Sequence, residues 1–167
     1  LGAGDLLFWP NSDRTRAEVI QQAAFVPIEN GFRAEYDYCN LMFVVAGAVI
    51  EAVSGQTWED LIQTRILDRV GMTETVPLAR LAEPARSALP HGRVGPPLRY
   101  QGAMVPIADS IVEVWNWDQA AAAGGVCTTP TDWAKWMTLR LKEGVLPDGS
   151  RLFSEAAARE MLRPNII

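Results

Sequence analysis

The sequence has little histidine and cysteine: its 167 residues include one His and two Cys. A scaffold held by disulfides and a zinc site built from His and Cys are both disfavoured, because each needs several such residues at short spacings. We therefore expect no metal site. His91, between Pro90 and Gly92, is expected to be a loop residue. Cys39 and Cys127 either pair with each other or stay as buried thiols, and buried thiols are the default.

Positive charge and long apolar runs are scarce as well. The chain has 15 Lys and Arg against 20 Asp and Glu, a net charge of -5. No basic stripe is available to displace counterions from phosphates, which disfavours a nucleic-acid-binding protein. The apolar run Leu41–Ile50 has roughly half the length that a membrane span needs, so we expect no span. No signal peptide is visible, so the compartment stays open between exported and cytoplasmic. The first residue is Leu1 and not Met, which fits a processed protein or a fragment.

What is present is the balance of a folded globular domain, with 49% hydrophobic and 21% charged residues. Capping residues and apolar periodicity predict a series of helices. They cover residues 15–24, 41–54, 58–70, 130–143 and 155–162. Prolines break residues 72–128, where 105–107 and 111–114 are expected as short strands, and 147–150 is expected as the turn of a small hairpin. The fold class predicted is mainly α: a single domain over 1–167 with a few short strands and long irregular loops.

The candidate site lies just before the apolar helix 41–54. Asn40 is a good N-cap for this helix, and Tyr38 projects in the same direction from an extended segment. The field at a helix N-terminus favours an anionic group, and a phenol acts as a general base once nearby cations hold its ionised form. An Asn amide can both donate to and accept from a substrate amide or ester. The structural alternative is that Tyr38 is an aromatic at the core edge and Asn40 is only a cap.

A nucleophile is missing from this picture. No serine is followed three residues later by lysine, and no Gly-x-Ser-x-Gly elbow occurs. Catalysis by serine requires a hydroxyl activated by a base. The residues by themselves therefore show a candidate base without a hydroxyl for it to activate.

Several segments resemble one family. The run from Phe32 through Tyr38-Cys39-Asn40 to Ser54-Gly55 resembles the serine beta-lactamase-like family, which groups class C beta-lactamases, D-alanyl-D-alanine carboxypeptidases and related esterases. The hallmark is Tyr-x-Asn followed by a buried helix ending in Ser-Gly. Residues 66–75 are similar to the family's Leu-Gly-Met-x-x-Thr segment and residues 123–132 to its Ala-Gly-Gly-x-x-Ser-Thr-x-x-Asp segment. The tail 152–164 also fits, so the segments follow the family's order over nearly the whole chain.

The resemblance implies a fold, a mechanism and roles for two residues. The fold implied is the helical region of the beta-lactamase/transpeptidase-like α+β fold. Tyr38, together with a lysine, would move the proton to and from a nucleophilic serine, and Asn40 would bind the substrate and orient its carbonyl side. The substrate implied is a beta-lactam, a D-Ala peptide or an ester, and the acyl-enzyme is hydrolysed without a metal or organic cofactor. Residues 72–128, with Trp115 and Trp117, are expected to form part of the pocket wall.

The sequence also departs from the family pattern. The Ser-x-x-Lys motif and the third motif, His-x-Gly or Lys-Thr-Gly, do not occur, and His91-Gly92-Arg93 does not fit the latter. We therefore expect residues 1–167 to be the middle portion of a longer hydrolase, without its N- and C-terminal sheet-forming parts and inactive alone. The alternative is a non-catalytic helical module that binds a ligand or partner. If the covering sheet is absent, the helix 41–54 should expose an apolar patch and self-associate.

Overall fold

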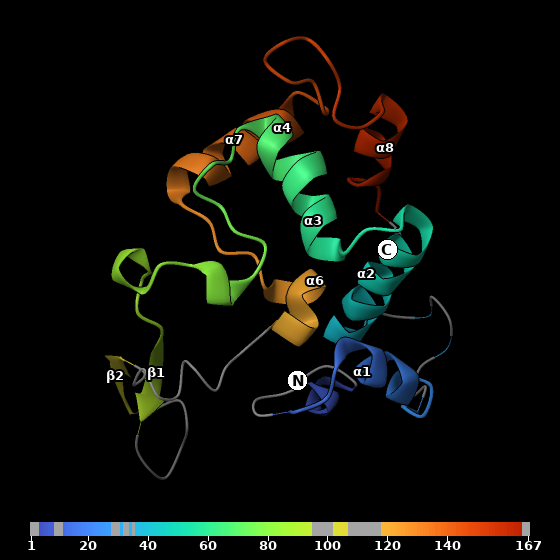
Figure 1. The fold of residues 1–167 in the computed structure, drawn as a ribbon, viewed down its shortest axis with the longest axis vertical. Coiled ribbons are helices and arrows are strands. Elements are labelled where there is room, and N and C mark those ends of the chain that lie inside the picture. Colours follow the sequence, from blue (N-terminus) through green and yellow to red (C-terminus); the bar gives the residue numbers. More distant parts are fainter. Residues whose placement is uncertain are drawn as a thin grey trace.

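A computed structural model of the chain describes residues 4–8, 12–27, 31, 34, 36–94, 102–106 and 118–164. Helices dominate the described part, and its strands are short, as the sequence predicts (Figure 1). The helices are α1 (Arg16–Ala23), α2 (Asn40–Ser54), α3 (Trp58–Ile62), α4 (Asp68–Val70), α6 (Ala121–Gly124), α7 (Pro130–Leu141) and α8 (Glu155–Glu160). Single helical turns are η1 (Asp5–Leu7), η2 (Gln63–Leu67), η3 (Ala79–Leu81), η4 (Pro84–Arg86) and η5 (Asp118–Ala120). The fold class is therefore mainly α.

Helix boundaries follow the capping residues in the sequence. In the part of the chain that the structure describes, four side chains accept a hydrogen bond from the backbone N–H three residues further on, which satisfies an N–H group that the helix itself leaves without a partner. They are Thr15, Thr57, Thr129 and Ser154. Gly55 and Gly71 end their helices in the left-handed region, with φ of 69° and 76°. The helix predicted over 58–70 contains a π-turn, η2, and α7 ends at Leu141 rather than near Glu143.

The described sheet is a single hairpin. Strands β1 (His91–Val94) and β2 (Ala103–Pro106) pair antiparallel, with His91 opposite Pro106. The strand expected at 105–107 overlaps β2, whereas the one expected at 111–114 lies outside the described residues. The expectation that His91 is a loop residue is wrong, because backbone pairing places it on β1. The turn at 147–150 closes a hairpin of one bridge, between Val145 and Arg151.

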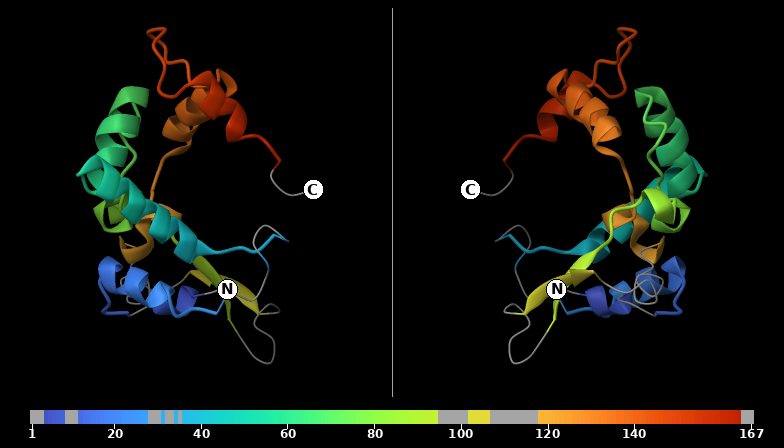
Figure 2. Two further views of the ribbon diagram at one scale, coloured as in Figure 1. Left: turned by 90° about the vertical axis from the view of Figure 1, so that its right-hand side faces the viewer. Right: turned by 90° about the vertical axis from the view of Figure 1, so that its left-hand side faces the viewer.

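Within the described residues, the helices pack around three small apolar clusters. In the side views α1 lies beneath α2, while α3 and α4 rise from the other end of α2 towards α7 (Figure 2). The first cluster joins η1, α1 and α2, the second joins α4 and α7, and the third joins α3 and α6. The buried members of the first cluster are Phe8, Val19, Leu41, Val44 and Ala120. Those of the second are Leu67, Val70, Met72, Leu139 and Leu146. Those of the third are Trp58, Leu78 and Ala121.

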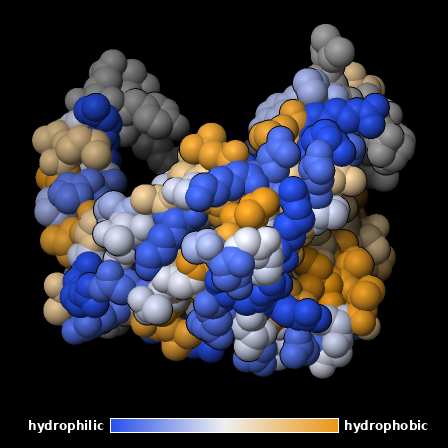
Figure 3. All heavy atoms as spheres, turned by 90° about the horizontal axis from the view of Figure 1, so that it is seen from above, coloured by the Kyte–Doolittle hydropathy of each residue, from blue (hydrophilic) through white to orange (hydrophobic). Residues whose placement is uncertain are grey.

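Helix α2 is only half covered, although nearly all its residues are apolar. Leu41, Val44 and Gly47 are buried on one face. The opposite face is a continuous run of exposed side chains, which we name the apolar stripe. It consists of Met42, Phe43, Val49, Ile50 and Val53. Apolar patches interrupt the hydrophilic surface on the face seen in Figure 3.

Within the described residues, no single helix is long and apolar enough to cross a bilayer. α2 and the segment Trp58–Val70 reach that length and composition only as a pair, with a bend of 79° between them.

Candidate active site at the start of α2

The first turn of α2 differs in one respect from the sequence prediction. Asn40 is the first residue of the helix, and the N-cap position is taken by Cys39, whose side chain makes no capping bond. The prediction that Asn40 is the N-cap is therefore wrong. Its side chain points instead to two other polar groups, those of Tyr38 and Asp5. These contacts replace the local bond that a capping Asn would make.

A chain of hydrogen bonds links three side chains here. The hydroxyl of Tyr38 donates to Oδ1 of Asn40 over 3.0 Å. The amide Nδ2 of Asn40 donates to Oδ2 of Asp5 over 3.3 Å. The structure thus brings together the two residues that the sequence singled out and adds Asp5, which the sequence places in a loop. No local pattern could have paired Asp5 with a residue 35 positions away.

Close packing places Asp5 beside α2. Its turn, η1, begins after Gly4, which has φ of 78°, a conformation that side chains other than glycine rarely adopt. A Cβ on Gly4 would lie 2.5 Å from Cδ2 of Leu41, so any other residue here would force the Leu41 side chain to shift. Phe8, at the other end of η1, joins Leu41 in the first apolar cluster. As a result, the Asp5 side chain is buried, with 2% of its surface exposed.

Tyr38 and Asn40 remain open to a ligand. Tyr38 is 55% exposed, and Asn40 is half-buried. A phenol can give or take a proton, and an amide can donate and accept, so the pair offers a proton-transfer group beside a group that binds carbonyls. Tyr36, two residues before Tyr38, is more exposed than Tyr38, and its neighbour Glu35 lies outside the described residues.

The described serines do not supply an activated nucleophile. Ser12, Ser54 and Ser87 donate their hydroxyls to backbone carbonyls, Ser150 donates to Asp148, and Ser154 caps α8. In this part of the chain no serine hydroxyl is bonded to a Lys or His side chain, the partners that would activate it.

The cysteines and the histidine offer no substitute. Both cysteines are half-buried thiols, so they do not pair. Burial raises the pKa of the Cys127 thiol, and Asp118 raises it further, which disfavours the reactive thiolate. Nδ1 of His91 lies 2.8 Å from the carbonyl oxygen of Leu89, on an exposed strand. In the described residues, no three His, Cys, Asp or Glu side chains gather in a way that could hold a metal ion.

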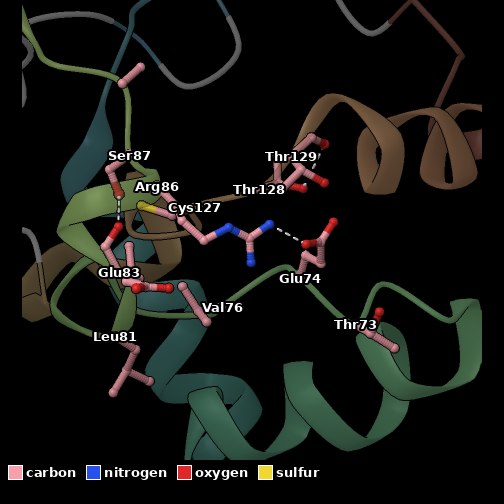
Figure 4. Close-up of a pocket in the computed structure, with 12 residues that line it drawn as sticks. Thr73, Glu74, Val76, Leu81, Glu83, Arg86, Ser87, Cys127, Thr128 and Thr129 are labelled. Carbon is pink, nitrogen blue, oxygen red and sulfur yellow. Dashed lines mark hydrogen bonds and ion pairs between the residues drawn. The ribbon is translucent and has the colours of Figure 1, made fainter.

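A separate pocket of about 420 Å³ lies in the irregular region, lined by parts of residues 73–88 and 127–129. Arg86 extends across it to form an ion pair with Glu74 (Figure 4). The lining of this pocket includes neither Tyr38 nor Asn40, so it is a different pocket from the substrate pocket whose wall residues 72–128 are expected to form, and that expectation stays a prediction. Trp115 and Trp117 lie outside the described residues.

The matching family model identifies the family. The model of the Beta-lactamase family matches residues 2–165. The chain belongs to the beta-lactamase family. Penicillin-binding protein 4 of Amycolatopsis lactamdurans is 28% identical over 125 residues, which are 74% of this chain and 30% of that protein. Unguisins hydrolase ungD of Aspergillus violaceofuscus is 27% identical over 126 residues, 74% of this chain and 21% of that protein.

Solved structures of an amidase and of a penicillin binding protein show the same fold. The D-amino acid amidase of Ochrobactrum anthropi SV3 superposes with a TM-score of 0.66 at 23% identity, over 87% of this chain and 42% of that one. The penicillin binding protein of Bacillus halodurans superposes with a TM-score of 0.68 at 19% identity, over 98% and 47%. At such identities the likeness concerns the fold alone. This beta-lactamase-family chain spans less than a third of the curated relatives and less than half of these two structures.

Proposed function

We propose that residues 1–167 form the helical part of a serine hydrolase that acts through an acyl-enzyme on a beta-lactam, a D-Ala peptide or an ester. One observation carries the proposal: the Tyr38 hydroxyl and the Asn40 amide are joined over 3.0 Å at the start of α2 and are open to a ligand. Membership of the beta-lactamase family supports it, because the relatives named above are a penicillin-binding protein and a hydrolase.

In this mechanism Tyr38 is the proton carrier. As a phenolate, the form that a nearby cation such as the lysine favours, its oxygen takes the proton of the nucleophilic serine while the serine oxygen attacks the substrate carbonyl. When the bond from the carbonyl carbon to the leaving nitrogen or oxygen breaks, Tyr38 returns the proton to the leaving group. Water then cleaves the acyl ester by the reverse transfers, while Asn40 holds the carbonyl side of the substrate. The serine and its lysine are supplied by a segment outside residues 1–167.

The experiment compares Tyr38→Phe with Tyr36→Phe in the intact protein. Both substitutions remove one exposed phenolic oxygen from the same segment, but only Tyr38 is bonded to Asn40. Rates are measured with nitrocefin, a D-Ala-D-Ala peptide and a p-nitrophenyl ester. We expect Tyr38→Phe to lower kcat/KM by roughly 10²- to 10⁴-fold, the usual worth of a positioned acid–base group, and Tyr36→Phe to leave it nearly unchanged. Equal rates in the two variants would refute the role of Tyr38.

A further inference from the structure

The pocket between η4 and the start of α7 carries charged groups of both signs on its walls. Its volume of about 420 Å³ falls within the range of about 300–1,000 Å³ that is usual for sites of small ligands. Arg86 extends across it to Glu74, and Glu83 lies on the other side of Arg86 (Figure 4). Glu74, and to a smaller extent Glu83, raise the pKa of the Arg86 guanidinium, which is therefore a permanent positive charge inside the pocket.

The charged groups of this pocket keep hydrogen-bonding capacity for a ligand. Arg86 donates to Oε1 of Glu74 through Nη2. Within the described residues, Nη1 and Nε of Arg86, the second oxygen of Glu74 and the carboxylate of Glu83 make no hydrogen bond. An exposed ion pair adds little to the stability of a fold, so the contact between Arg86 and Glu74 is not explained by stability alone.

The arrangement of the charges determines which ligands fit. A simple anion that bonds to Arg86 also meets the negative charges of Glu74 and Glu83, and a simple cation that bonds to Glu83 also meets Arg86. A zwitterion meets a charge of opposite sign at each of its two ends. Val76 and Leu81 add apolar surface to the same lining. The pocket therefore matches a small molecule with one positive group, one negative group and an apolar part.

We propose that this pocket binds a free α-amino acid with an apolar side chain. The carboxylate of the ligand accepts hydrogen bonds from Arg86, its ammonium group donates to Glu83, and its side chain lies against Val76. Hydrogen bonds between ionised groups are roughly twice as strong as those between neutral groups, so both ends contribute to affinity. The inference does not depend on the function proposed above, because the lining includes neither Tyr38 nor Asn40.

The binding test uses leucine, as both enantiomers, and two analogues that each lack one charge. 4-Methylpentanoate lacks the ammonium group, and 3-methylbutylamine lacks the carboxylate. Isothermal titration calorimetry of the intact protein measures the affinities without turnover. We expect one enantiomer of leucine to bind at least about tenfold more tightly than either analogue, because each analogue loses one charge-assisted hydrogen bond. Absence of leucine binding, or equal affinities for leucine and the analogues, would overturn the proposal.

Three variants place the ligand in the pocket. Arg86→Gln should weaken leucine binding by about tenfold or more without weakening the binding of 3-methylbutylamine, whereas Glu83→Gln should weaken leucine binding without weakening that of 4-methylpentanoate. Arg159→Gln is the matched control, since it breaks an ion pair of similar exposure, 67% against 62% for Arg86, outside the pocket. It should leave all affinities unchanged. If leucine bound equally well to the wild type and to Arg86→Gln, its site would lie elsewhere and the proposal would be wrong.

Discussion

The hydroxyl of Thr75 donates a hydrogen bond over 2.9 Å to the carboxylate of Asp132, 57 residues further along the chain. The same oxygen, Oδ2, accepts the backbone N–H of Glu74 over 2.8 Å, and the other accepts from Lys135 over 2.7 Å. Asp132 lies in the first turn of α7 and is 1% exposed. Two separate segments of the family pattern, around residues 71–75 and 123–132, are thus joined at one buried carboxylate.

Removing this carboxylate should be costly to the fold. Asp132→Ala leaves the Glu74 N–H without its acceptor. It also removes one partner each from the Thr75 hydroxyl and the Lys135 ammonium, which keep Thr128 and the carbonyl of Gly71. We expect a loss of about 3 kcal/mol in the free energy of unfolding, as for other broken buried pairs. Urea denaturation measures it. Asp148→Ala removes an exposed carboxylate that bonds within its own turn and should change stability little. Equal losses in the two variants would contradict the importance of the buried carboxylate.

The Asp132 carboxyl group also predicts that the stability of the fold depends on pH. Burial alone raises the pKa of the Asp132 carboxyl, but the bonds from Lys135, the Glu74 amide and Thr75 outweigh burial and hold the pKa below its ordinary value. A carboxyl with a lower pKa in the folded state stabilises that state above about pH 4, the unfolded value for aspartate. This contribution disappears as the pH falls through the lower, folded pKa. The melting temperature should therefore drop more steeply below about pH 4 in the wild type than in Asp132→Asn. Parallel curves of melting temperature against pH in the two proteins would contradict this role of the Asp132 carboxyl group.

Arg16 is the second polar centre of the fold. Its guanidinium donates to Glu51 over 2.8 Å, to Glu59, and to the carbonyl oxygen of Asp118 over 3.0 Å. These bonds connect α1 with α2, α3 and η5. Arg16→Met should cost about 2 kcal/mol, less than a fully buried pair because Arg16 is 22% exposed.

The matched control for Arg16 is Arg159. It pairs with Glu155 on the surface of α8 and is 67% exposed. Arg159→Met should cost about 0.5 kcal/mol or less, as is usual for surface pairs. Thermal and urea unfolding of both variants provide the comparison. If Arg159→Met lowered the free energy of unfolding as much as Arg16→Met, the hydrogen bonds of Arg16 would not explain the loss that its substitution causes.

The helices were predictable because their signals are local. Thr15 and Glu18 form the capping box that their spacing indicates, and Gly55 ends α2 in the conformation expected of a glycine. The Tyr38–Asn40 contact could also be predicted from the sequence, because it depends only on two residues that are close in the chain. These features depend on neighbours in the sequence, and tertiary packing did not override them.

Contacts between distant segments could not be predicted in this way. Asp5 reaches Asn40 across 35 positions because η1 packs on α2, and no periodicity in a Gly-rich segment indicates that. The same packing explains why Asn40 lies inside the helix and does not cap it. Strand β1 was missed because His91, Gly92 and Arg93 lack the apolar alternation of a strand. This segment is a strand because its backbone pairs with β2.

The proposed mechanism predicts that the 167-residue chain is chemically inert by itself. No described serine hydroxyl is bonded to a Lys or His side chain, and burial raises the pKa of the Cys127 thiol. The chain should neither hydrolyse nitrocefin nor be labelled by a fluorescent penicillin or a fluorophosphonate. Mass spectrometry after incubation checks for an adduct. Stoichiometric labelling of any serine would show that the chain contains its own nucleophile, and the assignment of the serine to another segment would then be abandoned.

The apolar stripe of α2 predicts self-association of the chain. Val49 and Val53 are 57% and 84% exposed, and apolar area of this kind is stabilised when a second molecule removes it from water. We expect the mass measured by light scattering to rise with concentration. Val53→Lys should reduce this rise without lowering the melting temperature, because its side chain packs on little in the monomer. Gln21→Lys places the same charge on the exposed polar face of α1 and should leave association unchanged. A constant monomer mass in the wild type, or an equal effect of the two lysines, would show that the stripe does not mediate association.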